Sequence, residues 1–398
     1  MNEATTLILI AAGALVLPLL AGRMLVPAVV LEILFGVVMG PNGLGWIEHS
    51  ELLDFLAEFG FFLLMFLSGF EIDFGKLGRQ GPGQISVALV VFASTLGLSF
   101  FFSKQLGHGP FVTFLLATTS MGLVVPTLRA TRRTQTPLGQ AILICAALAD
   151  FLTMIGVTVF ALAYEHGVGW QLMKVPALFA IIAVVLLALR QTAYWYPEKF
   201  ERLFRPDDPD EMGIRTSLAL LFVFVGLSLA FDVEPILGAF LAGTVFSLVF
   251  RHRGSLEREL SGFSFGFLIP IFFINVGVGF DVSALFDPTA LIHGGLILAA
   301  ALTVKLFPSL LLVLRGISLR DSIAAGALLS ARLSLVIAVA SLGVRLGLLG
   351  RDLQAEVILL AAVTTTFAPT VFRLLCPPLG NDGSRPHSIE PFRDFGDV

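Results

Sequence analysis

The chain has 398 residues, of which 56% are hydrophobic and only 14% are charged, and its formal net charge is −4. The mean hydropathy of +0.91 lies far above that of a soluble domain, so the composition excludes a water-soluble globular protein and predicts a polytopic helical membrane protein. The small net charge says little about partners, because most of the surface would face lipid.

The sequence offers no enzyme signature. It has no glycine-rich phosphate loop, no Cys/His metal cluster and no convincing nucleophile with its base, so we expect no enzymatic activity, no cofactor and no nucleic-acid partner. Cys145 and Cys376 fall within or at the end of apolar segments, and we interpret both as packing residues. The first segment lacks a basic region before its apolar run and is expected to be an uncleaved spanning helix.

Hydropathy divides the chain into thirteen candidate membrane spans, and the predicted fold class is therefore an all-α polytopic membrane protein. In chain order the spans are 5–22, 25–40, 53–70, 84–102, 110–128, 138–164, 172–190, 212–231, 235–250, 263–280, 289–314, 321–344 and 353–376.

The connections between these spans alternate in basic charge. One set holds fifteen basic residues: Arg23, Lys76, Arg79, Arg129, Arg132, Arg133, Arg190, Lys199, Arg202, Arg205, Arg251, Arg253, Arg258, Arg315 and Arg320. The opposite set holds four: Lys104, Lys174, Arg345 and Arg351. The positive-inside rule makes the first set cytoplasmic, which predicts a protein of the cell (inner) membrane with its N-terminus outside and its C-terminus inside. All three Trp and all three Tyr fall at predicted span ends, as an aromatic belt requires.

The span 138–164 contains Asp150 as its only ionisable carboxylate or amine. At about 1.5 Å per residue, Asp150 lies roughly 18 Å from Leu138, close to the middle of the hydrocarbon. A lone carboxylate there is costly unless it is protonated, paired or facing water, so it indicates an ion or proton path. The alternative is an acid that only fixes helix packing through a permanent partner.

The long connection 191–211 divides the chain into two six-helix halves, joined by the span 172–190. An odd number of helices between equal halves inverts the second half, which is the arrangement of inverted-repeat transporters. Gly, Ser, Thr and Pro near the middle of corresponding spans, at 118–126 and 326–336, predict two broken crossing helices. Close helix packing is the alternative explanation for these small residues.

Two cations also lie near the centres of their spans. A charged Lys305 or Arg332 is as costly in free energy there as a charged Asp150, so at least one of them should pair with Asp150. Helix-end carbonyls are the other possible partners of the two cations. Thr119 and Ser120 in the first broken segment are the expected ion ligands beside Asp150.

The remaining polar candidates carry weaker expectations. Ser334 follows the second break, and Glu71 lies at a span end, where a helix-end or funnel role is favoured over ion coordination. Glu32 could line an ion funnel or a dimer interface. His293 and Asn275 are expected only to form hydrogen bonds.

Six motifs occur in order along the chain: VPAVVLEILFGVVMGPNGLG (26–45), LAEFGFFLLMFLSGFEID (56–73), TTSMGLVVP (118–126), LADF (148–151), GAFLAGTVFS (238–247) and IPIFFINVGVGFD (269–281). Together they resemble the monovalent cation:proton antiporters of the Kef and NapA type, from Val26 to about Cys376. The resemblance implies that Asp150 carries either a proton or a monovalent cation, with no other metal, and that Lys305 stands near it.

The resemblance also implies a homodimer built from two kinds of domain. Residues 1–83 and 212–281 would form the dimerisation domain, residues 84–164 and 289–376 the mobile core, residues 172–190 a linker helix and residues 377–398 a short cytoplasmic tail.

This sequence departs from the family pattern at three points. Ala149 stands where the family usually has Asp, Asn or Gln before the essential Asp, and Arg332 lies near a position that is often acidic. The tail of about 22 residues has no room for a nucleotide-binding regulatory domain, so regulation through such a domain is not expected on this chain.

The sequence as a whole predicts an antiporter that exchanges Na+ or K+ for H+ by alternating access, with a role in pH homeostasis. Because Ala149 leaves one carrier carboxylate, the exchange is expected to be electroneutral. Two alternatives stay open: a transport-inactive sensor or accessory homologue, and an anion transporter of the same fold that uses Arg332.

Overall fold

The computed structural model describes residues 3–24, 28–48, 50–71, 82–167, 169–195, 211–249, 254–279 and 288–378. The expected tail 377–398 and the connection 191–211 therefore lie largely outside the described residues. Within the described ranges every regular element is helical.

The first half of the chain contains α1 (Glu3–Met24), α2 (Ala28–Met39), α3 (Glu51–Glu71), α5 (Pro82–Gln105), α6 (Phe111–Ala117), α7 (Met121–Ala130), α8 (Pro137–His166), the 3-10 helix η1 (Trp170–Met173) and α9 (Lys174–Trp195). The second half contains α11 (Met212–Ala230), α12 (Pro235–Val249), α13 (Gly254–Phe263), the π-helical turn η2 (Ser264–Leu268), α14 (Ile269–Val278), α15 (Pro288–Ser309), the 3-10 helix η4 (Leu310–Arg315), α16 (Leu319–Leu329), α17 (Ser334–Arg345) and α18 (Arg351–Leu375).

Among the described residues, ten helical stretches are long and apolar enough to cross a membrane, and the bent pair α16–α17 makes an eleventh. Two further predicted spans correspond to α2 and α12, which are apolar but only 12 and 15 residues long. A helix needs about 20 residues to cross the hydrocarbon core, so these two fall short by length. The structure thus confirms the all-helical membrane fold, and the count of thirteen stays a prediction.

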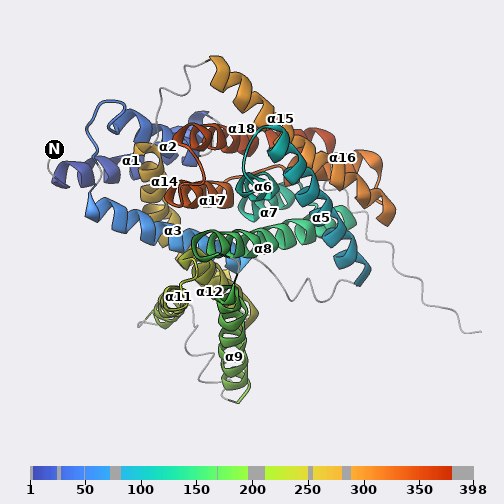
Figure 1. The fold of residues 1–398 in the computed structure, drawn as a ribbon, viewed down its shortest axis with the longest axis horizontal. Helices are drawn as coiled ribbons and strands as arrows, with labels where there is room; N and C mark the ends of the chain where they lie inside the picture. The colour runs from blue at the N-terminus through green and yellow to red at the C-terminus, as the bar shows by residue number, and fades with distance from the viewer. Residues whose placement is uncertain are drawn as a thin grey trace, which may run out of the picture.

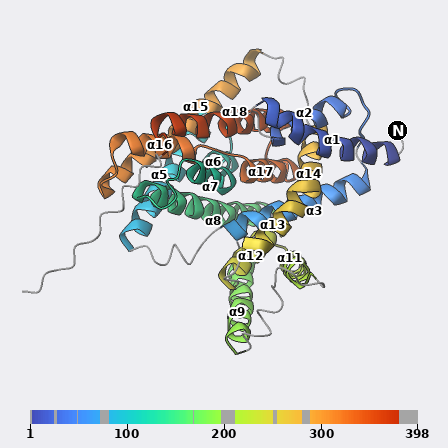
Figure 2. The ribbon, with the colours of Figure 1, turned by 180° about the vertical axis from the view of Figure 1, so that it is seen from behind.

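The two broken segments occupy the centre of the molecule. In Figures 1 and 2, α6, α7 and α17 lie between α8 and α18, with α1, α2, α3 and α14 on one side and α5 and α16 on the other. Contacts are extensive between α3 and α12, between α14 and α2, and between α5 and each of α6, α8 and α15. The central helices are thus enclosed by others, and most of the stretch Phe111–Ala130 is buried inside the protein.

The packing of α3 on α12 depends on two glycines. A Cβ at Gly69 would collide with the carbonyl oxygen of Phe240, and a Cβ at Gly243 would collide with that of Phe66. Small residues allow such backbone contact between membrane helices, where no hydrophobic effect drives association. The ring of Phe66 then packs against that of Phe246, with their centroids 6.0 Å apart.

Candidate functional site

Two interruptions of helical structure meet at the centre of the molecule. The first separates α6 from α7 over residues 118–120, where Thr118 and Ser120 have extended backbone angles. The hydroxyl of Thr118 donates to the carbonyl of Leu115 at 2.8 Å, a local bond that competes with continued helix. The second separates α16 from α17 over residues 330–333, with a bend of 44°. Both predicted broken helices are therefore present.

The first break exposes polar backbone groups inside the protein. Helix α6 ends with carbonyls that lack intrahelical partners, and α7 begins with amides that lack them. Such ends carry partial charges, negative at a C-terminus and positive at an N-terminus. Each therefore stabilises a side chain of opposite charge.

Asp150 of α8 lies at the amide end of this break. Its side chain is 4% exposed, and its Oδ2 accepts a hydrogen bond from the amide of Met121, the first residue of α7, at 3.3 Å. The backbone amide of Thr119 and the ammonium group of Lys305 also contribute to its electrostatic environment. Asp150 Oδ1 and the buried hydroxyl of Ser120 have no hydrogen-bond partner among the described residues. Two buried oxygens at the break are thus available to a ligand.

Lys305 of α15 lies at the carbonyl end of the same break. Its buried Nζ donates to the carbonyl of Ala117, the last residue of α6, at 2.6 Å and to the hydroxyl of Thr119 at 2.7 Å. A cation at this position neutralises the negative end of α6.

Arg332, within the second break, connects both breaks to α15. The side chain is fully buried at 0% exposure. Its Nη2 donates to the carbonyls of Leu116 at 2.7 Å and Ala301 at 2.9 Å, and its Nε donates to that of Thr118 at 3.3 Å. Only Nη1 lacks a partner in the described part of the chain.

The expected direct ion pair between Asp150 and a buried cation is not found among the described residues. No ion pair within 4.0 Å joins Asp150 to Lys305 or Arg332 in the described structure, and both cations donate to carbonyls instead. The reason is that the break frees carbonyls of α6, which are closer acceptors than the carboxylate. Lys305 and Asp150 still attract each other at longer range.

Glu71, Ser334 and Ala149 lie at or near the breaks. Glu71 is the last residue of α3, and a Cβ built on Gly122 would lie 3.8 Å from its Oε1 and 3.8 Å from Ser120 Oγ. The carboxylate therefore sits beside the start of α7, closer to the break than a helix-end role alone implies. Ser334 is the first residue of α17, and Ala149 is buried beside Asp150 in α8.

The other polar side chains make the hydrogen bonds expected of them. His293 Nδ1 lies 3.1 Å from Glu356 Oε2, and Asn275 donates to Asp54 Oδ1 at 3.2 Å. Glu32 is buried in α2, which packs against α1 and α14.

Thr153 is a polar residue of this region that the sequence analysis missed. It follows Asp150 by three residues on the same face of α8, is fully buried, and its hydroxyl has no hydrogen-bond partner in the described structure. The spacing from Asp150 was the signal that could have identified it.

Comparison with known proteins assigns the chain to a family. Residues 9–376 match the family model described as sodium/hydrogen exchanger, transmembrane. The protein YjbQ of Bacillus subtilis (strain 168) is 35% identical over 401 residues, which cover 94% of this chain and 63% of YjbQ. This chain therefore spans less than two thirds of that relative. The Na(+)/H(+)-K(+) antiporter GerN of Bacillus cereus is 25% identical over 360 residues, which cover 87% of this chain and 89% of GerN.

A solved structure shares the fold. The sodium proton antiporter MjNhaP1 from Methanocaldococcus jannaschii matches with a TM-score of 0.61 at 13% sequence identity, covering 93% of this chain and 96% of that one. This likeness shows a common arrangement of helices, and the family model matches nearly the whole chain. The chain belongs to the sodium/hydrogen exchanger family of membrane transporters.

Proposed function

We propose that this protein exchanges a monovalent cation, Na+ or K+, for H+ across the membrane, with Asp150 as the common carrier. The observation that carries the proposal is the buried carboxylate at the amide end of a broken helix, where Asp150 Oδ1 and the hydroxyl of Ser120 are both buried without a partner among the described residues. A cation bound there would be coordinated by oxygen atoms, and a proton would occupy the same carboxylate. The two ligands therefore compete.

Alternating access would convert that competition into exchange. The core would comprise α5–α8 and α15–α18, and would move against a dimeric scaffold of α1–α3 and α11–α14. Relatives named for Na+, K+ and H+ support this substrate class. We place the N-terminus outside and the C-terminus inside, from the distribution of basic residues.

The anion-transport alternative is less well supported. Arg332 would have to bind the anion, yet its guanidinium donates to three backbone carbonyls and is fully buried. A bound anion would have to compete with acceptors that are already in place. This arrangement favours a structural role for Arg332.

The proposal is tested in proteoliposomes with a trapped pH-sensitive dye. Adding Na+, K+ or Li+ to the wild type should move protons, whereas choline should not. Asp150→Asn keeps the side-chain volume and removes the charge, so cation-dependent flux should fall to that of empty liposomes. Asp54→Asn, an exposed acid near the start of α3, is the matched control and should retain wild-type flux.

Two outcomes would count against the proposal. Flux in Asp150→Asn equal to wild type would exclude Asp150 as the carrier. No flux in the wild type with any of the three cations would favour the transport-inactive alternative.

A further inference from the structure

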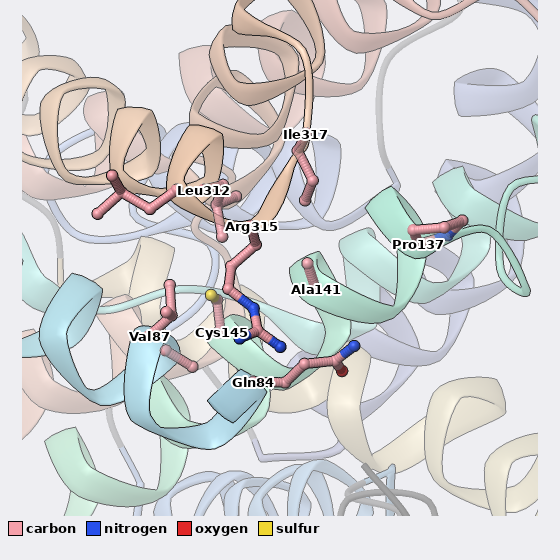
Figure 3. Close-up of a pocket in the computed structure, with 10 residues that line it drawn as sticks. Gln84, Val87, Pro137, Ala141, Cys145, Leu312, Arg315 and Ile317 are labelled. Carbon is pink, nitrogen blue, oxygen red and sulfur yellow. The ribbon is translucent and has the colours of Figure 1, made fainter. Parts of the chain in front are cut away.

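A cavity of about 320 Å³ lies between the start of α5, the first turns of α8 and the end of η4. Its size falls within the range of small-molecule sites, about 300–1,000 Å³. Figure 3 shows Arg315 extending from η4 into this space, toward Gln84 of α5, with Ala141 and Cys145 of α8 beside it. Apolar residues such as Val87 complete the wall.

The guanidinium group of Arg315 occupies an electrostatically unusual position. A Cβ on Gly83, the second residue of α5, would lie 2.6 Å from Arg315 Nη1, so the cation sits at the amino end of that helix. Pro137, the first residue of α8, lines the same cavity, and the amide of Gly139 behind it is already capped by the Thr136 hydroxyl at 3.1 Å. The amino end of α5 carries partial positive charge, which repels the guanidinium group that faces it.

The polar groups of this cavity also lack partners. The side chain of Arg315 is exposed and forms no hydrogen bond or ion pair with any other described residue, and the buried Oε1 position of the half-buried Gln84 side chain has none among them either. An amide can present its NH2 group there instead, because its oxygen and nitrogen are interchangeable by a flip. An anion in the cavity would receive hydrogen bonds from Arg315 and Gln84 and would offset the positive charge.

We propose that this cavity binds the phosphate group of an anionic phospholipid. Guanidinium groups bind phosphate with two parallel hydrogen bonds, and helix amino ends favour phosphate as well. Next to Arg315, Leu314 is 78% exposed and Val313 is 43% exposed, so the rim faces the space that acyl chains occupy. Free inorganic phosphate shares the headgroup chemistry, and the test below separates the two sources.

The test uses the purified protein in detergent and measures binding by native mass spectrometry and by the rise in melting temperature. The probes are phosphatidylglycerol, phosphatidylcholine as the zwitterionic lipid, and inorganic phosphate against chloride at equal ionic strength. Arg315→Gln removes the charge. Gly83→Ala keeps the charge and adds the Cβ that would displace the guanidinium, which is the end of a flexible side chain. Arg320→Gln is the matched control, because Arg320 is exposed at the start of α16 and does not line the cavity.

We expect the wild type to bind phosphatidylglycerol more tightly than phosphatidylcholine. Arg315→Gln and Gly83→Ala should bind phosphatidylglycerol about tenfold or more weakly than the wild type, and Arg320→Gln should bind it as the wild type does. If inorganic phosphate raises the melting temperature as phosphatidylglycerol does, with the same dependence on Arg315, the cavity binds free phosphate, and the assignment to a phospholipid is overturned. Equal binding to Arg315→Gln and wild type, or an equal loss in Arg320→Gln, would overturn the proposal. Melting temperatures without ligand show whether each variant is folded.

Discussion

Charges of opposite sign flank the first helix break, and each faces the end of a helix that stabilises it. Asp150 accepts from the amide that begins α7, and Lys305 donates to the carbonyl that ends α6. Burial penalises an ionised carboxylate, whereas amides and a nearby ammonium group favour it. This balance is what a carrier requires, because neither the protonated nor the cation-bound form should be strongly preferred.

Lys305→Ala tests the structural part of this arrangement. The substitution leaves the Ala117 carbonyl and the Thr119 hydroxyl without their donor, and each buried unsatisfied group costs about 1–3 kcal/mol. We expect the melting temperature in detergent to fall by several degrees.

Lys174→Ala is the control for that variant. Lys174 pairs with Asp232 at 2.6 Å in an exposed ion pair, and such pairs contribute little to stability. A melting temperature for Lys305→Ala equal to that of Lys174→Ala, together with unchanged transport, would mean that Lys305 is a bystander.

Sequence reasoning singled out Asp150, Lys305 and Arg332, which the structure brings to the first helix break, but it did not predict all of their contacts. Asp150 and Lys305 stand out because ionisable groups are rare inside spans. Helix-end carbonyls were expected as possible partners of Lys305 and Arg332, but the particular carbonyls could not be predicted, because they belong to segments far away in the sequence. Thr153 was missed because a threonine in an apolar helix usually bonds to its own backbone, and this one does not.

At the level of helices, Arg332 joins the two broken segments and α15. Its planar guanidinium reaches three carbonyls at once, a geometry that a lysine cannot reproduce. The side chain therefore fixes how the carbonyl end of α6 lies against the second break.

We expect Arg332→Leu to destabilise the protein more than Lys305→Ala, because three carbonyls lose their donor instead of one carbonyl and one hydroxyl. Thermal unfolding in detergent measures the difference, and Arg332→Lys should recover only part of the loss. The matched control is Arg345→Gln, at the exposed end of α17, where the nearest acid lies 3.9 Å away. Stability of Arg332→Leu equal to that of the control would contradict the structural role.

Helix boundaries were predictable where composition changes sharply. The predicted segments 118–126 and 326–336 contain the observed breaks at 118–120 and 330–333, because small and polar residues compete with helical hydrogen bonds. The predicted span 263–280 begins earlier, as the polar helix α13 and the π-helical turn η2. Hydropathy could not predict this earlier start, because α13 is polar. Its position depends instead on its packing against α11.

At the scale of the whole molecule, the two proposed domains touch where α3 contacts α7 and α17 and where α12 contacts α8. A narrow crevice between α8, α12 and α17 is lined by Met154, Ile236 and Leu342. Glu234 also lines this crevice and pairs with Arg345 of α17 at 3.9 Å. Burial raises the pKa of Glu234, and Arg345 opposes that rise. This pair would have to separate if the core moves against the scaffold.

The stoichiometry of exchange is also a property of the whole transport cycle. With Ala149 beside it, Asp150 is the only carboxylate in this turn of α8, so one cation would exchange for one proton without net charge. In proteoliposomes with a potassium potential set by valinomycin, sodium-driven proton flux should be independent of voltage. Flux that accelerates with either sign of the potential would indicate a second carrier, with Lys305 as the candidate.

The central claim is that proton and cation compete for Asp150, and the pH dependence of the apparent KM for the cation tests it most directly. Proteoliposomes held at equal pH on both sides allow the KM and the maximal rate to be measured at each pH. Competition predicts that the KM rises about tenfold for each pH unit below the pKa of the carrier, while the maximal rate at saturating cation is unchanged. A constant KM with a maximal rate that falls as the pH is lowered would contradict a shared carboxylate.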